Sequence, residues 1–119
     1  MKESVVVIKS FDFAIRIVNL YKYLVDKKKE YVMSKQVLRC GTSIGANVKE
    51  SRDAESKLDF IHKLSVALKE VDETSYWLEL LCKTEFISIE QFENLNDNVV
   101  ELRKIISSII LTTRQNLNS

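Results

Sequence analysis

The stretch "RCGTSIGANVKES", from Arg39 to Ser51, holds the only two glycines of the chain, Gly41 and Gly45. The chain has no proline, so its most flexible residues lie in this one segment. A glycine inside a helix costs roughly 0.5–1 kcal/mol relative to alanine. Small residues four apart share one helix face and let a neighbouring helix approach closely. We therefore predict a helix here, with Gly41 and Gly45 at a close helix contact.

A ligand approaching the backbone is the alternative reason for these glycines. A phosphate-binding loop needs a glycine-rich turn that ends in Lys-Ser or Lys-Thr. The sequence "GTSIG" lacks that ending. Close packing is the better interpretation.

The composition favours a single all-α domain over residues 1–119. The chain has 119 residues, 45% of them hydrophobic and 29% charged, which suits one ordinary core. Scarce glycine and absent proline leave little turn chemistry for β-hairpins. Cys40 and Cys82 lack CxxC spacing and fall at apolar positions, as expected for core thiols in a reducing compartment. The apolar run over residues 5–8 is too short for a signal peptide, so we expect a soluble, cytoplasmic protein with no membrane contact.

Sequence signals at helix ends predict four helices. Ser10 is the expected N-cap of the first, over residues 10–28, with Asp12 in its first turn. Ser34 is the expected cap of the second, over 34–54, with Met33 and Leu38 spaced as a hydrophobic staple.

Capping boxes mark the other two starts. Ser56 with Asp59 begins a helix over residues 57–83, and Ser88 with Gln91 begins one over 89–114. Ile87 and Phe92 have staple spacing at the last start.

Short connections between long helices place neighbours antiparallel, so the expected architecture is an up-down-up-down four-helix bundle. The last helix has apolar residues in steps of three and four, which is a seam for bundle packing. Further apolar residues widen this seam and predict a second buried face, in the bundle or against another chain: Val100, Ile105, Ile110 and Leu111.

A polar stripe runs along the second helix beside its apolar face. On the third helix, Glu70 and Glu73 share a face with Val66 and Trp77. Antiparallel pairing about residue 56 brings Arg39 level with Glu73, and we predict a partly buried, charge-assisted bridge from Arg39 to Glu73 or Glu70. Near the turn, Asn47 and Glu50 are expected to satisfy backbone groups or His62. The predicted structural polar network comprises Gln36, Arg39, Ser43, Asn47, Glu50, Glu70 and Glu73.

A catalytic or metal site is the alternative use of these polar residues. Carboxylate-bridged metal bundles use Glu-x-x-His on two helices, and zinc needs several histidines or cysteines. His62 is the only histidine. We expect no catalytic residue, no metal and no cofactor, and a small-ligand site remains a lesser alternative.

The charge pattern gives only a weak signal for nucleic acid. Eighteen basic and 17 acidic residues give a net charge of +1, whereas dedicated nucleic-acid binders are usually basic. Residues 1–55 have 11 basic and 7 acidic side chains (+4), and residues 56–119 have 7 and 10 (−3). The run from Lys27 to Lys29 suits a solvated helix end that complements the helix dipole. A phosphate-binding role is the alternative, with possible nucleic-acid contacts at Lys22, Lys27, Lys28 and Lys29.

The segments "LRCGTSIGANVKESRDAESKLDFIHKL" and "ALKEVDETSYWLELL" resemble the four-helix-bundle family of 23S rRNA intervening sequence proteins. The likeness extends from "SFDFAIRIVNLYKYL" to "ELRKIISSII". Its most specific parts are Arg39, Ser43-Ile44-x-x-Asn47-Val48-x-Glu50 and Glu70-x-x-Glu73-x-x-Tyr76-Trp77-Leu78. Many members have glycine where this chain has Ser51.

The resemblance implies a homo-oligomer, typically a ring-like pentamer, with no defining enzymatic activity. The fold is also similar to accessory proteins of diversity-generating retroelements, which are basic pentamers that contact a reverse transcriptase and nucleic acid. Two hypotheses follow. The first is a non-enzymatic, self-associating bundle that serves as a scaffold or binds a partner protein, and the second is an accessory protein associated with RNA or DNA.

Overall fold

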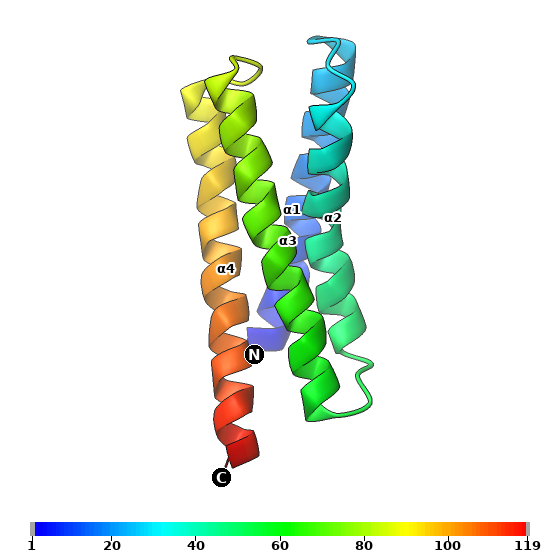
Figure 1. Cartoon of the computed structure of the whole chain (residues 1–119), viewed down its shortest axis with the longest axis vertical. Coiled ribbons are helices and arrows are strands. Elements are labelled where there is room, and N and C mark those ends of the chain that lie inside the picture. Colours follow the sequence, from blue (N-terminus) through cyan, green and yellow to red (C-terminus); the bar gives the residue numbers. More distant parts are fainter. Residues whose placement is uncertain (1, 119) are drawn as a thin grey trace.

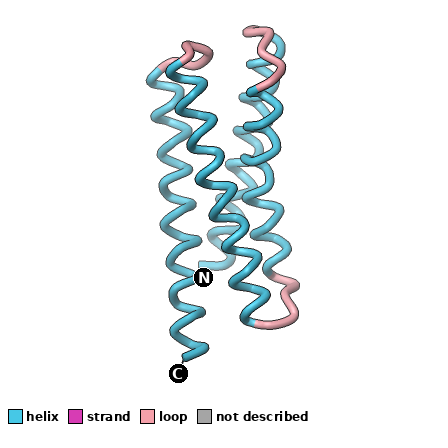
Figure 2. The backbone as a smooth tube through the Cα atoms, viewed as in Figure 1, coloured by secondary structure: helices cyan, strands magenta, loops and turns pink. Residues whose placement is uncertain are grey.

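The computed structural model describes residues 2–118, and they form an antiparallel bundle of four helices with no strand among them (Figures 1 and 2). The helices are α1 (Lys2–Asp26), α2 (Met33–Ser51), α3 (Lys57–Lys83) and α4 (Ile89–Asn118). Each helix packs against two others, in the cyclic order α1, α2, α3, α4. The bundle measures 51 × 22 × 20 Å, and none of these helices is both long and apolar enough to cross a bilayer.

The first helix begins eight residues before the predicted start. Ser10 is therefore not an N-cap: it is buried inside α1, where its hydroxyl donates to the Val7 carbonyl at 3.2 Å. The β-branched run over residues 5–8 has modest helix propensity, but the buried Val6 packs into the core and holds the extra turns. The helix ends at Asp26, directly before the run from Lys27 to Lys29 and two residues short of the predicted end at residue 28.

Glu30 caps α2 in place of the predicted Ser34. Its carboxylate accepts backbone N–H bonds from Val32, Met33 and Ser34 at 3.1, 3.0 and 2.7 Å. The Ser34 hydroxyl donates back to the Glu30 carbonyl at 2.8 Å. Three of the orphan donors at this helix start are thus satisfied by one buried carboxylate, which the helix dipole also favours.

The capping signals of α3 and α4 are present in the structure. The Ser56 hydroxyl accepts a hydrogen bond from the Asp59 N–H at 3.0 Å. The Asp59 carboxylate accepts from the Glu55 N–H and not from the Ser56 N–H, so the pair is not a full capping box. Ser88 and Gln91 exchange both bonds of a capping box, at 2.8 and 3.0 Å. The bounds of α3 agree with the sequence, whereas α2 ends at Ser51 rather than residue 54 and α4 continues to Asn118.

The two glycines lie where α2 contacts α1, as the sequence predicts. A Cβ on Gly41 would lie 2.8 and 2.9 Å from the two γ-carbons of Ile17, which is buried in α1. A Cβ on Gly45 would lie 3.2 Å from the Ser10 carbonyl oxygen. Neither glycine has a positive φ, so close approach and not backbone freedom explains them.

Most of the extra apolar residues predicted to widen the α4 seam are at least partly covered by the bundle, and the unpartnered apolar face lies on α1. In α4, Ile110 is buried, and Val100 and Ile105 are half-buried within the bundle. Only Leu111 of the predicted extra residues is exposed. In α1, large apolar side chains cover the surface opposite the core: Val5, Ile8, Phe11 and Ile15.

Replacing Gly41 with alanine should destabilise the protein by about 1–3 kcal/mol, because overpacking against Ile17 outweighs the better helix propensity of alanine. Chemical denaturation of the single variants and of the double variant Gly41→Ala/Ile17→Ala checks this. The double variant should lose less stability than the two single losses added together, since truncating Ile17 removes the clash. A Gly41→Ala variant more stable than the parent would contradict the packing argument.

Replacing Glu30 with glutamine should cost about 1–2 kcal/mol at neutral pH. Burial raises the pKa of Glu30, but the N–H bonds from Ser34, Met33 and Val32 outweigh burial and leave the pKa below its usual 4.5. The charged form is therefore favoured in the folded state, so its stabilisation is present above pH 4.5 and is lost as the pH falls through the folded pKa. Urea denaturation of the parent and of Glu30→Gln at a series of pH values should show the stability difference shrinking over that acid range.

Candidate functional site

The predicted polar network is centred on Arg39, which reaches from α2 to α3. Its guanidinium contacts Glu70 at 3.6 Å and forms a hydrogen-bonded ion pair with Glu73. The Gln36 side-chain oxygen accepts from Arg39 at 3.4 Å on the same helix. Antiparallel register predicts this pairing, and the structure contains it with both carboxylates engaged.

Burial within this group is uneven. The Arg39 side chain is 50% exposed, Glu73 is 38% exposed and Glu70 is only 18% exposed. Solvent screens the Arg39–Glu73 pair, so it contributes less than a buried bridge does. Glu70 is the carboxylate that would lose most if Arg39 were removed.

Aromatic side chains continue the network on α3. The Trp77 indole N–H donates to Glu73 at 3.3 Å, and Tyr76 lies edge-on to Trp77 with 5.1 Å between ring centroids. Tyr76 is exposed. The spacing in the sequence places Trp77 on the carboxylate face but gives no sign of its bond to Glu73.

The rest of the predicted stripe does not reach Arg39's partners on α3. The Ser43 hydroxyl donates to the Arg39 carbonyl at 2.6 Å, and the Asn47 amide donates to the Ser43 carbonyl at 2.8 Å. Glu50 pairs with Lys63 at 3.5 Å, and His62 is exposed and takes no part. Ser43 and Asn47 thus satisfy their polar groups within α2, whereas Glu50 pairs with α3 through Lys63 and not through His62.

The thiols are free in the structure. Cys40 is buried and Cys82 is half-buried. Burial raises the pKa of the Cys40 thiol, so it stays protonated and weakly nucleophilic at neutral pH. Within residues 2–118, no three histidine, cysteine, aspartate or glutamate side chains lie close enough to hold a metal ion.

The four lysines considered for nucleic-acid contact are all exposed. Lys27, Lys28 and Lys29 lie at the end of the bundle where the loop after α1 and the loop after α3 both turn (Figure 1). The Lys28 ammonium lies 6.0 Å from the centroid of the Tyr23 ring. Lys22 lies one turn earlier, on α1. Their contact with nucleic acid stays a prediction.

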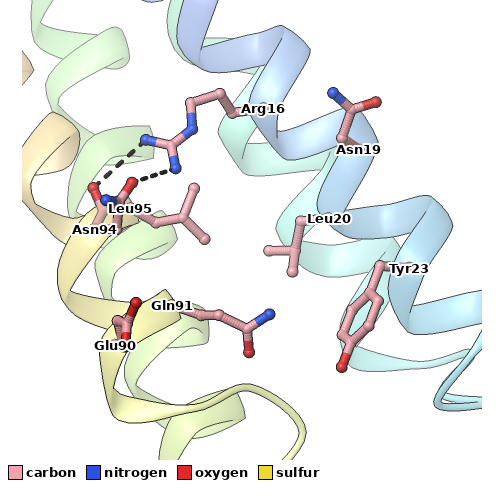
Figure 3. Close-up of a pocket in the computed structure, with 8 residues that line it drawn as sticks. All are labelled: Arg16, Asn19, Leu20, Tyr23, Glu90, Gln91, Asn94 and Leu95. Carbon is pink, nitrogen blue, oxygen red and sulfur yellow. Dashed lines mark hydrogen bonds between the residues drawn. The ribbon is translucent and has the colours of Figure 1, made fainter.

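Sequence reasoning missed a second polar cluster, between α1 and α4. Arg16 donates to the side-chain oxygens of Asn94 and Asn98, both at 2.5 Å. Beside this contact is an open groove of about 460 Å³ (Figure 3). The only sequence signal is the spacing of four between Asn94 and Asn98, which puts both amides on one face of α4. The partner, Arg16, is 78 and 82 residues away along the chain.

Comparisons with known proteins place the chain beside a defined group. A family model described as "23S rRNA-intervening sequence protein" matches residues 2–108. A crystal structure at 1.70 Å of a protein of unknown function from Bacteroides thetaiotaomicron, of the S23 ribosomal protein family, is 59% identical. The match covers 92% of this chain and 98% of that one, with a TM-score of 0.92. No curated protein matches the chain.

Replacing Arg39 with methionine should lower the free energy of unfolding by about 1–2 kcal/mol, chiefly because Glu70 loses its partner while mostly buried. Urea denaturation measures the loss. The matched control is Arg103→Met, since Arg103 pairs with the more exposed Asp72 and should cost less. Equal losses of stability in Arg39→Met and Arg103→Met would mean that the pair of Arg39 with Glu70 stabilises the fold no more than the exposed pair of Arg103 with Asp72.

Proposed function

This chain belongs to the 23S rRNA-intervening sequence protein family, and from that premise we propose that it is a non-enzymatic bundle that self-associates and serves as a scaffold or binds a partner protein. The observation that carries the proposal is the apolar outer face of α1. Ile8, Phe11 and Ile15 are 61%, 65% and 47% exposed. These residues recur in steps of three and four, and Val18 continues the series half-buried.

A second copy of the chain is the occupant that this face fits best. Steps of three and four form a seam that packs against another helix. Lys22 also lies on this seam, and helical spacing places Asp12 and Asp26 at its edge. All three side chains are exposed. A second α1 would bring carboxylates towards Lys22, which a purely apolar partner would not.

The number of copies that we propose is five. It follows from the resemblance to family members that assemble as ring-like pentamers. The width of the apolar surface supports contact with more than one neighbour, because half-buried Val7, Ala14 and Tyr21 extend it along one edge.

The absence of enzymatic activity is part of the proposal. Arg39, Glu70 and Glu73 pair with one another rather than with an open cavity. Cys40 lies beside that group, but burial raises the pKa of its thiol and keeps it protonated. His62 lies about two helical turns before Glu70 and is exposed, so neither residue supplies an activated nucleophile beside a base.

An RNA- or DNA-associated accessory role is the second candidate. It is favoured by the exposure of Lys22, Lys27, Lys28 and Lys29, none of which takes part in an ion pair within the described residues. The exposed Tyr31 at the same loop offers a ring on which a base can stack. The near-neutral net charge of +1 makes this the weaker of the two candidates.

The double variant Phe11→Asp/Ile15→Asp should dissociate the assembly to a single chain of 13.8 kDa. Light scattering after size exclusion measures the mass, and the parent should elute as a salt-resistant multimer. The control Leu111→Asp changes an equally exposed residue on α4 and should keep the parent's mass. A parent that elutes at 13.8 kDa at micromolar concentration would overturn the proposal.

The same experiment with added bulk RNA separates the two candidates. Phosphate contacts give a steep salt dependence, so a nucleic-acid binder gains mass at low salt and loses it at high salt. A multimer whose mass does not change with RNA at low salt would exclude the second candidate.

A further inference from the structure

The groove between α1 and α4 lies beside the outer face of α1, and its residues Arg16, Leu20 and Tyr23 do not belong to that face. The floor of the groove is apolar, because Leu20 and Leu95 lie at its base, both buried. Arg16 and Tyr23 of α1 line one wall, and Gln91 of α4 lines the other (Figure 3). An open volume of about 460 Å³ is within the range of small-molecule sites.

Arg16 differs from the other cations that contact a neighbouring helix. Lys9, Arg39, Lys63 and Arg103 each contact a carboxylate. Within the described residues Arg16 contacts only neutral oxygens, from Asn94 and Asn98. These oxygens accept three hydrogen bonds from the guanidinium, which has five N–H groups, and they carry no charge. Arg16 therefore keeps further N–H groups and a positive charge that no carboxylate contacts within the described residues.

The opposite end of the groove offers neutral polar groups. The Gln91 side-chain oxygen accepts from the Ser88 N–H at 2.8 Å, which fixes the amide and leaves its NH₂ group free to donate. Figure 3 shows the Gln91 side chain extending across the groove towards α1, with the Tyr23 hydroxyl on the facing side. A neutral ligand oxygen would find two donors there.

Glu90 adds a negative charge at this second end. It lines the groove four residues before Asn94, about 6 Å along the helix axis from the contact of Asn94 with Arg16. A second anionic group on a ligand would meet this carboxylate, whereas a hydroxyl would not.

We propose that this groove binds small organic monocarboxylates that have an apolar chain and a neutral polar end. The carboxylate pairs with Arg16, the chain covers Leu20 and Leu95, and the polar end lies beside Gln91 and Tyr23. Glu90 disfavours dicarboxylates of the same length. This site does not depend on self-association, since Arg16, Leu20 and Tyr23 lie on another side of α1 from the outer face that contains Phe11.

Binding to the full chain can be measured by chemical-shift titration with 6-hydroxyhexanoate, its neutral amide 6-hydroxyhexanamide, and hexanedioate. The hydroxy acid should bind at least about tenfold tighter than the amide, because the amide loses the charge-assisted bonds to Arg16. It should also bind tighter than hexanedioate, and the shifts should map to Leu20, Tyr23 and Leu95.

Variants separate the charge of Arg16 from its contact with α4. Arg16→Gln should weaken the hydroxy acid about tenfold, whereas Arg16→Lys should keep most of the affinity. Arg103→Gln is the control and should bind as the parent does. If Arg16→Gln unfolds, Glu90→Gln provides the test, since it leaves the Arg16 contacts intact and should raise the affinity for hexanedioate.

Three results would overturn the proposal: equal binding of the hydroxy acid and its amide, unchanged binding by Arg16→Gln, or no shifts in the groove at millimolar ligand. A Glu90→Gln variant that discriminates against hexanedioate as the parent does would remove the role given to Glu90.

Discussion

The close contact between α1 and α2 at Gly41 determines the arrangement of the bundle. Ile17 lies directly over Gly41, at a distance that leaves no room for a methyl group. Because Ser10 and Gly45 repeat this contact further along, α1 is fixed in rotation as well as in distance. The buried face of α1 therefore points into the core, and its opposite face, with Phe11 and Ile15, points outwards.

Much of this fold was predictable because its signals are local. The N-cap at Ser56 and the capping box at Ser88 mark helix starts from residues three apart, and the glycine spacing marks a face of α2. The pairing of Arg39 with Glu70 and Glu73 was also predictable, since an antiparallel hairpin with a short turn fixes which residues are level. Once the centre of the turn is located, the register of the two helices follows.

The errors arose where tertiary packing overrides local preference. A β-branched run at residues 5–8 argues against helix by propensity, but burial of Val6 stabilises those turns. Glu30 lies outside the usual set of N-cap residues, so its capping role could be found only with the loop geometry in view. Arg16 and its asparagines were missed for a different reason: no hairpin register relates α1 to α4, and their pairing depends on closure of the whole bundle.

α1 carries three different surfaces. One face fills the core through Phe13 and Ile17. A second, through Arg16 and Leu20, borders the groove against α4, where polar contacts replace much of the apolar packing. The third exposes Ile8 and Phe11 to solvent, which in an isolated chain favours non-specific aggregation. Since a helix buried on one side needs only one apolar stripe, the third surface is the one on which the proposed self-association rests.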